Sequence, residues 1–138
     1  MKHFQLYELV DKHTFETQGE EAWKLFNPEA LIALDDLRDF FDASVTVNAW
    51  HEFSGGYQWR GWRTPEKAAE LGAPHSQHAK GNAFDIDVRG YTAEQARQVI
   101  ITHKDDPLLK RIMRLEAAKP WVHFDLLSVV NRIYIFKA

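Results

Sequence analysis

The stretch Ser76-Gln-His-Ala-Lys-Gly-Asn-Ala-Phe-Asp-Ile-Asp87 indicates both the fold and the chemistry of this chain. His78 and Asp85 stand on either side of Gly81 and Ala83, where little side-chain bulk keeps another atom away. Zinc in catalytic sites is held by three protein ligands, among them imidazole nitrogens and carboxylate oxygens, and keeps a fourth position for water. The stretch therefore has the composition of half a metal site. The rest of the chain must supply a third ligand, a base and a group that binds substrate.

Strands are predicted where β-branched and aromatic residues alternate with polar ones. The segment from Ala83 to Val88 has this pattern, and it places Asp85 and Asp87 on one face because side chains alternate along a strand. Four further segments have strand character: 44–50, 112–116, 121–126 and 132–136.

Helices are predicted from their start signals and from apolar periodicity. Asn27 and Pro28 begin the clearest helix, since asparagine caps a helix and proline fits its first position, and apolar residues then recur on one face as far as Phe41. Thr92 and Gln95 form a capping-box pattern that opens a helix over 92–102. Shorter helical turns are predicted over 20–25 and from residue 106.

The glycine-rich segment 51–73 contains aromatic and arginine residues and is predicted to be a long irregular loop of the functional kind. Helices that lead into antiparallel strands predict an α+β fold, with a small, mostly antiparallel sheet and flanking helices.

The composition narrows the classes of protein to consider. With 138 residues, 45% of them hydrophobic, the chain is expected to form one domain over residues 1–138. Its 17 basic and 20 acidic residues give a formal charge of -3 without any basic run, so we expect no nucleic-acid partner. The absence of cysteine excludes disulfides, thiolate zinc sites and a cysteine nucleophile. No segment approaches the roughly 18 apolar residues of a membrane span, and the N-terminus lacks a secretory pattern.

His123 is the candidate for the third metal ligand. A histidine between Val122 and Phe124 on a strand is by itself more often a hydrogen-bonded core residue. Its strand could neighbour that of Asp85, however, and two imidazoles with one carboxylate match a catalytic zinc site. Asp87 and Asp125 compete for the carboxylate role, or either could orient a ligand imidazole by a hydrogen bond.

The motifs of two other classes of hydrolase are incomplete in this chain. His51-Glu52 is followed by Gly55 where the helical zinc-protease motif needs its second histidine. Ser54 and Ser76 lack the Gly-x-Ser-x-Gly elbow of serine hydrolases.

The stretch from Ser76 to Asp85 resembles the Ser-x-His-x-x-Gly-x-Ala-x-Asp signature of zinc-dependent peptidoglycan peptidases, the family of D-Ala-D-Ala carboxypeptidases and L-alanyl-D-glutamate endopeptidases. Trp121-Val-His-Phe-Asp125 resembles the second signature of that family. The resemblance covers roughly residues 45–125 and implies a hedgehog-like α+β domain. It also implies a zinc ion on His78, Asp85 and His123.

The same resemblance implies a general base shortly before the last histidine. The commonest family spacing puts a glutamate three residues before it, where this chain has Pro120. Glu116 is the only carboxylate between Asp106 and His123, and it is therefore the candidate base. Its alternative role is that of an exposed glutamate in a surface ion pair or turn.

Arg63 matches the family arginine that holds a substrate carboxylate or carbonyl, a task that suits the planar, permanently charged guanidinium. Arg60 lies close enough in sequence to share that role, and Ser76 is expected to support the zinc loop and to touch substrate. The aromatic segment from Tyr57 to Trp62 is expected to form one wall of the groove, with Trp62 binding substrate.

The resemblance implies a zinc peptidase that cuts a bond in peptidoglycan stem peptides, as a carboxypeptidase or an endopeptidase. We expect a monomeric enzyme of the phage or prophage lytic type, made in the cytoplasm, that reaches the cell wall through a separate pore or in a virion. The alternative is a non-catalytic, zinc-containing binding module or a virion structural module.

Overall fold

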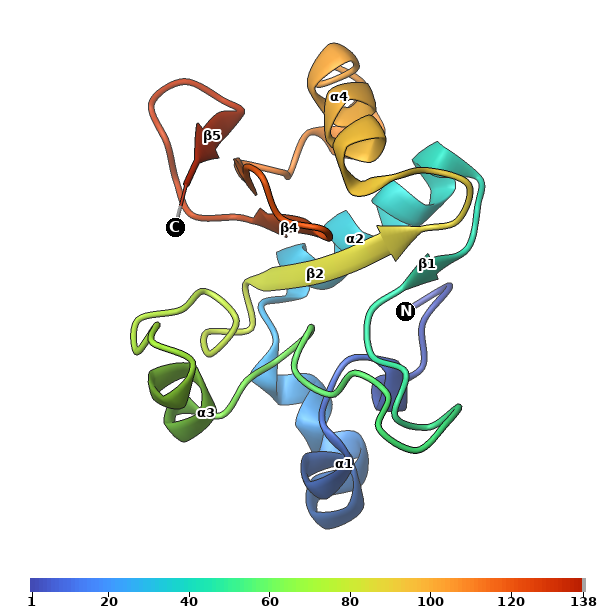
Figure 1. The fold of residues 1–138 in the computed structure, drawn as a ribbon, viewed down its shortest axis with the longest axis vertical. Helices are drawn as coiled ribbons and strands as arrows, with labels where there is room; N and C mark the ends of the chain where they lie inside the picture. Colours follow the sequence, from blue (N-terminus) through green and yellow to red (C-terminus); the bar gives the residue numbers. More distant parts are fainter. Residues whose placement is uncertain (138) are drawn as a thin grey trace.

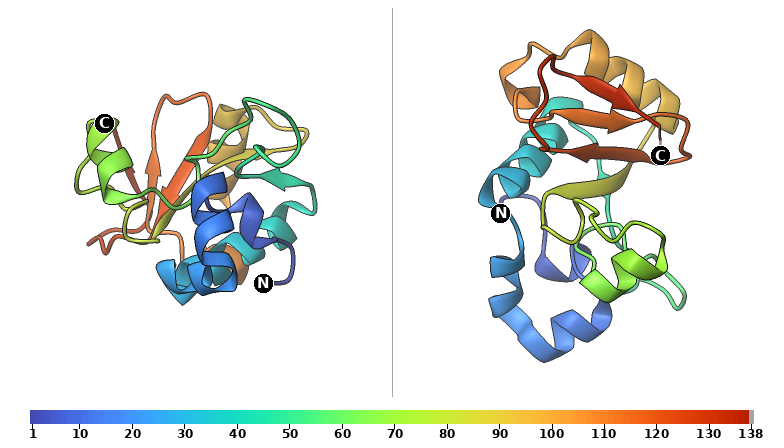
Figure 2. Two further views of the ribbon diagram at one scale, coloured as in Figure 1. Left: turned by 90° about the horizontal axis from the view of Figure 1, so that it is seen from below. Right: turned by 90° about the vertical axis from the view of Figure 1, so that its left-hand side faces the viewer.

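The computed structural model describes residues 1–137, and Figure 1 shows its strands and helices. In chain order the elements are η1 (Leu6–Glu8), α1 (Lys12–Gln18), η2 (Gly19–Leu25), α2 (Pro28–Phe41), β1 (Val45–Thr46), α3 (Pro65–Glu70), β2 (Ala83–Val88), α4 (Ala93–Thr102), η3 (Pro107–Leu109), β3 (Arg114–Glu116), β4 (Val122–Asp125) and β5 (Tyr134–Phe136). Figure 2, right, shows the strands toward one end of the molecule and α1 at the other. Within the described residues, no helix is long and apolar enough to cross a membrane.

The strands form one sheet in the order β1-β2-β4-β3-β5. All neighbours pair antiparallel except β3 and β5, which are parallel. The prediction of an α+β fold with a mostly antiparallel sheet is confirmed. The pairing of β2 with β4 sets Asp85 directly opposite His123, so the two strands are neighbours as the sequence predicts.

The two faces of the sheet have different compositions because side chains alternate along each strand. One face is apolar and packs into the hydrophobic core with α2, which lies behind β2 in Figure 1, and with α4. The opposite face carries the polar residues Asp85, Glu116, His123 and Asp125. The apolar face contributes Phe84, Ile86, Leu115, Val122 and Phe124, all almost fully buried.

The main helices begin where their capping signals lie. The Asn27 side chain accepts a hydrogen bond from the Glu29 amide, with Pro28 at the first helical position. The Thr92 and Gln95 side chains form both bonds of a capping box at the start of α4. The helices predicted over 28–41 and 92–102 are therefore confirmed, since their signals are local.

Segments that depend on distant contacts differ from the predictions. The strand predicted over 44–50 is reduced to Val45–Thr46, because from Asn48 onward the backbone bonds to other partners: Asn48 N to the Glu8 carbonyl, and Ala49 N to the Tyr57 carbonyl. The predicted irregular loop contains the short helix α3, which Thr64 caps. The helical turn predicted over 20–25 is part of a 3-10 helix, and α1, which precedes it, lacks a predicted counterpart.

Candidate active site

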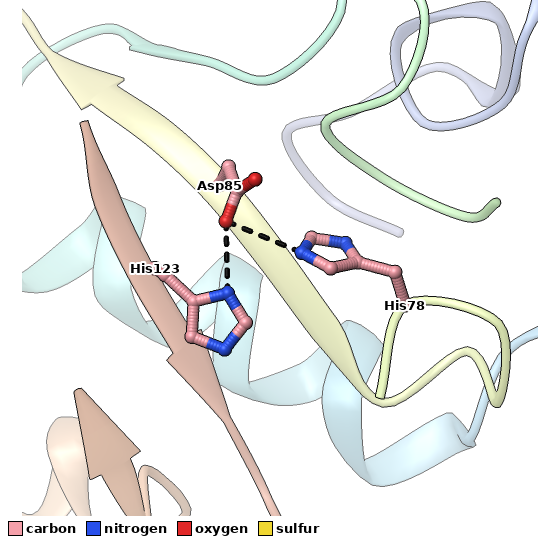
Figure 3. Close-up of side chains that lie close together, drawn as sticks. All are labelled: His78, Asp85 and His123. Carbon is pink, nitrogen blue, oxygen red and sulfur yellow. Dashed lines mark hydrogen bonds and ion pairs between the residues drawn. The ribbon is translucent and has the colours of Figure 1, made fainter. Parts of the chain in front are cut away.

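Three buried side chains converge on the polar face of the sheet. Asp85 lies on β2, His123 lies opposite it on β4, and His78 extends from the loop that precedes β2. Figure 3 shows the Asp85 carboxylate between the two imidazole rings. All three residues are at least nine-tenths buried. The strand pairing and the loop thus gather residues that are far apart in the sequence.

The separations among these side chains suit a metal ion. Asp85 Oδ1 lies 2.9 Å from His123 Nδ1 and 3.2 Å from His78 Nε2. Each residue offers one ligand atom, and these three atoms lie within 4.8 Å of one another. Four-coordinate zinc with bonds of about 2.0 to 2.1 Å holds its ligand atoms about 3.3 Å apart. The cluster needs little rearrangement to hold an ion of this kind.

The outer nitrogen of each imidazole has its own partner. His78 Nδ1 lies 2.8 Å from the Gly61 carbonyl oxygen, which can only accept, so this nitrogen donates and Nε2 presents its lone pair to the cluster. His123 Nε2 lies 2.8 Å from Asp125 Oδ2 and is oriented in the same way. Metal-binding histidines typically have such partners, which fix the ring and the tautomer. The residues present therefore fit a zinc ion.

The charges of the cluster are strongly coupled. Burial works against the ionised form of Asp85, but the imidazoles of His78 and His123 hold its pKa well below the usual range. Burial likewise opposes protonation of His123, yet hydrogen bonds to Asp125 and Asp85 raise its pKa to about 9. The His123 imidazole and the Asp85 carboxylate thus favour one another's charged forms.

Asp125 is itself held by hydrogen bonds from Arg114. It is fully buried, and both of its oxygens accept hydrogen bonds from Arg114, at 2.9 and 2.8 Å. The Arg114 guanidinium lies 4.0 Å from the centre of the Phe136 ring. Two-point bonding of this kind restricts rotation of the carboxylate, so Asp125 holds the His123 ring in one orientation. Asp125 takes the orienting alternative considered from the sequence, and Asp87 is exposed and bonded to Arg60.

Glu116 shares a cavity with the cluster. This charged cavity, of about 450 Å³, is lined among others by Arg63, His78, Arg114, Glu116 and His123. Glu116 is 8% exposed and lies on the polar face of β3, the strand next to β4. Within residues 1–137 its carboxylate has no hydrogen-bond partner or ion pair, so it is available to a ligand.

Two of the three guanidinium nitrogens of Arg63 are hydrogen-bonded within the protein. Its Nε donates to the Trp59 carbonyl at 2.7 Å and its Nη2 to Asp85 Oδ2 at 3.1 Å, while no described residue accepts from Nη1. Burial lowers the pKa of the guanidinium, and the charges of Asp85 and Glu116 oppose that shift. The group stays charged near neutrality and lines the charged cavity. Ser76 also lines this cavity, and its Oγ accepts a hydrogen bond from the His78 amide.

Two other predicted substrate-binding residues, Arg60 and Trp62, do not line the charged cavity. Arg60 lines a second, aromatic cavity of about 410 Å³, which is formed by residues 55–60 together with Asp85 and Trp121. Trp62 is buried in the hydrophobic core, with its indole N–H bonded to the Ala79 carbonyl, and it lines neither cavity. The structure thus places Trp62 among the residues that support the site.

Glycine at position 81 is required by the backbone packing around it. Gly81 has φ +68°, and a Cβ there would lie 2.0 Å from the Leu25 carbonyl oxygen and 2.6 Å from the Phe26 Cα. The space predicted to admit a metal at this glycine is therefore filled by backbone, and this part of the prediction is corrected. The Gly81 carbonyl accepts a hydrogen bond from the Asn27 amide, which attaches the loop that carries His78 to the start of α2.

The sequence reasoning missed Arg114 and the Gly61 carbonyl. Arg114 lies two residues before Glu116 and so shares its face of the strand, a signal that could have been used. The Gly61 carbonyl had no such signal, because only tertiary packing brings it to His78.

An α+β fold that brings two imidazoles and a carboxylate together, beside a cavity that a glutamate also lines, is typical of metal-dependent hydrolases. Comparison with known protein families matches residues 2–125 to Peptidase M15. The match spans most of the chain, so the chain belongs to the peptidase M15 family, which consists of zinc-dependent peptidases. Searches among curated proteins and among solved structures gave no significant match.

Proposed function

We propose that this protein is a zinc peptidase that hydrolyses a peptide bond in the stem peptides of bacterial peptidoglycan. One observation carries the proposal. His78, Asp85 and His123 converge beside a cavity that also contains Glu116 and Arg63, the two groups that peptide hydrolysis needs in addition to a metal. Membership of the M15 family supports the zinc ion and the peptide substrate.

His78, Asp85 and His123 are the residues that would hold zinc. When bound, zinc supplies Lewis acidity, which lowers the pKa of a water molecule toward about 7 and polarises a carbonyl group. Asp125 and the Gly61 carbonyl bond the outer nitrogens of the two imidazoles, so that the inner nitrogens face the place where the ion would bind.

Glu116 moves the protons. Its carboxylate, which has no hydrogen-bond partner among residues 1–137, accepts a proton from the attacking water and then donates this proton to the amine that leaves. General acid–base catalysis of this kind contributes about 10² to 10⁴ in rate. The side chain is suited to the task because it lies in the same cavity as the imidazoles.

Arg63 positions the substrate. Its Nη1 is available to bond a carboxylate or carbonyl oxygen, while the bonds of Nε and Nη2 hold the guanidinium in place. Because the group is fixed before substrate arrives, little conformational entropy is lost on binding.

The test is the release of free amino groups from purified peptidoglycan in the presence of zinc. Wild type should release them, and His78→Ala and Glu116→Gln should not. Glu16→Gln, which changes an exposed glutamate on α1, is the matched control and should behave as wild type. If wild type releases no more than His78→Ala, the proposal is wrong. Zinc binding without any turnover would instead favour a non-catalytic wall-binding module.

A further inference from the structure

The aromatic cavity has no role in the mechanism above, although it adjoins the metal cluster. Its volume of about 410 Å³ lies within the usual range for ligand cavities. Asp85 lines this cavity, while His78 and His123 line the charged one, so the two cavities meet at the cluster. A ligand that extends across the cluster would therefore occupy both cavities.

The two cavities lie toward opposite ends of β4. Trp121, His123 and Asp125 alternate onto the same face, so Trp121 marks one end of the site and Asp125 the other. At the Trp121 end, Arg60 lies 5.8 Å from the indole ring and bonds Asp87 at 2.6 Å. The cluster of His78, Asp85 and His123 thus lies between the two cavities.

The charge of the two sides differs. In the aromatic cavity the Arg60 guanidinium lies 3.8 Å from the centre of the Tyr57 ring and is neutralised by Asp87. Asp85, the other charged residue that lines it, is compensated by the imidazoles and by Arg63. The aromatic cavity therefore suits an uncharged group with a flat apolar surface, since an unpaired charge would lose its hydration there.

The backbone of the residues that line the aromatic cavity is hydrogen-bonded to other parts of the fold. The Tyr57 carbonyl accepts hydrogen bonds from the amides of Ala49 and Trp50. The Trp121 carbonyl accepts a hydrogen bond from buried Arg97 on α4, at 2.9 Å. Both aromatic residues are thus attached to the rest of the fold through their backbones.

The position of Glu116 indicates which half of the substrate occupies each cavity. Glu116 lines the charged cavity and not the aromatic one. If it returns its proton to the leaving amine, as the proposed function requires, the leaving half of the substrate occupies the charged cavity. The half that carries the scissile carbonyl then lies in the aromatic cavity.

We propose that the aromatic cavity binds the uncharged N-acetylmuramoyl sugar to which the stem peptide is attached, and that the bond cut is the one between L-Ala and D-Glu. The apolar face of a sugar ring packs well on flat aromatic side chains. The sugar, its lactyl group and L-Ala carry no charge, whereas a cut further along the stem would bring its charged residues to the aromatic side. In the charged cavity Arg63 faces the carboxylates of the D-Glu side.

The reaction balances as a simple hydrolysis. Water adds its oxygen to the L-Ala carbonyl carbon, the carbon–nitrogen bond to D-Glu breaks, and Glu116 transfers a proton from the water to the nitrogen. The products are a muramoyl-L-Ala carboxylate and a peptide with a free amino terminus.

The experiment compares a muramoyl tetrapeptide with the same tetrapeptide carrying an N-acetyl group in place of the sugar. Wild type with zinc should cut the sugar-bearing substrate with a kcat/KM about tenfold higher, and mass spectrometry should place the cut after L-Ala. Tyr57→Ala and Trp121→Ala should remove the preference, so that the ratio of the two kcat/KM values falls to about one. Phe53→Ala, an exposed aromatic residue that lines neither cavity, is the matched control and should keep it.

Binding of both peptides to the Glu116→Gln variant, measured by calorimetry, provides a readout that does not depend on turnover. The sugar should strengthen binding about tenfold, and adding Tyr57→Ala should remove that gain. If wild type cuts the two peptides with equal kcat/KM, or cuts at the D-Ala end, the inference is overturned and the proposed hydrolysis stands. Cleavage of neither peptide, with tighter binding of the sugar, would overturn the hydrolysis and keep the sugar site.

Discussion

The strand pair β2–β4 and the loop from Asn48 to Asn82 supply the two halves of the site by different means. Asp85 and His123 are paired directly across the sheet, so regular backbone hydrogen bonds set their positions. The loop is held by scattered contacts: the Asn48 side chain bonds the Val10 carbonyl and the Arg60 amide, and Trp62 N bonds the Leu9 carbonyl. The strand pair is therefore fixed by a regular backbone ladder, whereas the loop depends on contacts with the N-terminal segment.

This difference separates two kinds of residue. Those on the sheet are expected to determine metal binding and chemistry, and those on the loop are expected to determine substrate binding. His78 is the exception, since it belongs to the loop and completes the metal cluster. Four experiments test whether the two halves are as separate as the structure indicates.

The largest effect is expected for Glu116→Gln on the sheet side. Loss of the base should lower kcat about 10³-fold, and because Glu116 is not among the cluster residues, zinc content should stay at the wild-type level. Steady-state kinetics on a stem peptide and elemental analysis give the two values. A variant that loses zinc along with activity would show that Glu116 is itself a ligand.

Zinc is expected to stabilise the whole molecule through the strand pair. At about 100 times the dissociation constant it should add about 2.7 kcal/mol to the free energy of unfolding, which for this chain length raises Tm by roughly 8 °C. Thermal unfolding with zinc and with a chelator measures the shift. His78→Ala should abolish it, and a shift that survives in this variant would place the ion elsewhere.

Asn48→Ala tests the loop side. Asn48 is 2% exposed and forms two side-chain hydrogen bonds at 3.0 Å, so its loss should cost about 2 kcal/mol of stability in urea unfolding. Zinc affinity should not change. Exposed Asn131→Ala is the control for the substitution itself. A parallel fall in zinc affinity would show that loop and strand pair are one unit.

The smallest effect is expected for Arg63→Lys. Lysine keeps the charge but loses the planar fork, so KM for a stem peptide should rise roughly tenfold, with a smaller change in kcat. Steady-state kinetics separate the two constants, and exposed Arg89→Lys should leave both unchanged. If kcat falls and KM does not, Arg63 acts on the transition state and not in binding.

The same contrast explains what the sequence could predict. β2, α2 and α4 follow from alternation, periodicity and caps, which are properties of neighbouring residues. The placing of His123 beside Asp85 follows from two strand signals and a resemblance, and the register confirms that they are neighbours. The assignment of the zinc ligands, the general base and the substrate-binding arginine to particular residues stays a prediction until the variants are measured.

The loop was harder to predict because its contacts are distant in sequence. Nothing local distinguishes Trp62, which packs in the core, from Trp121, which lines the aromatic cavity. The backbone contact that requires glycine at position 61 comes from Leu9, far away in the chain, where a Cβ would lie 2.0 Å from the carbonyl oxygen. Such contacts exist only once the N-terminal segment has folded against the loop.

The alternation along β4 also constrains how the site can change over time. Trp121, His123 and Asp125 line the two cavities, while Val122 and Phe124 between them fill the core. A deletion or insertion of a single residue here would exchange the two sets at once and bury the charged side chains. Lineages that descend from this chain can therefore retune the site by substitution, while a change in the length of β4 would remove fold and function together.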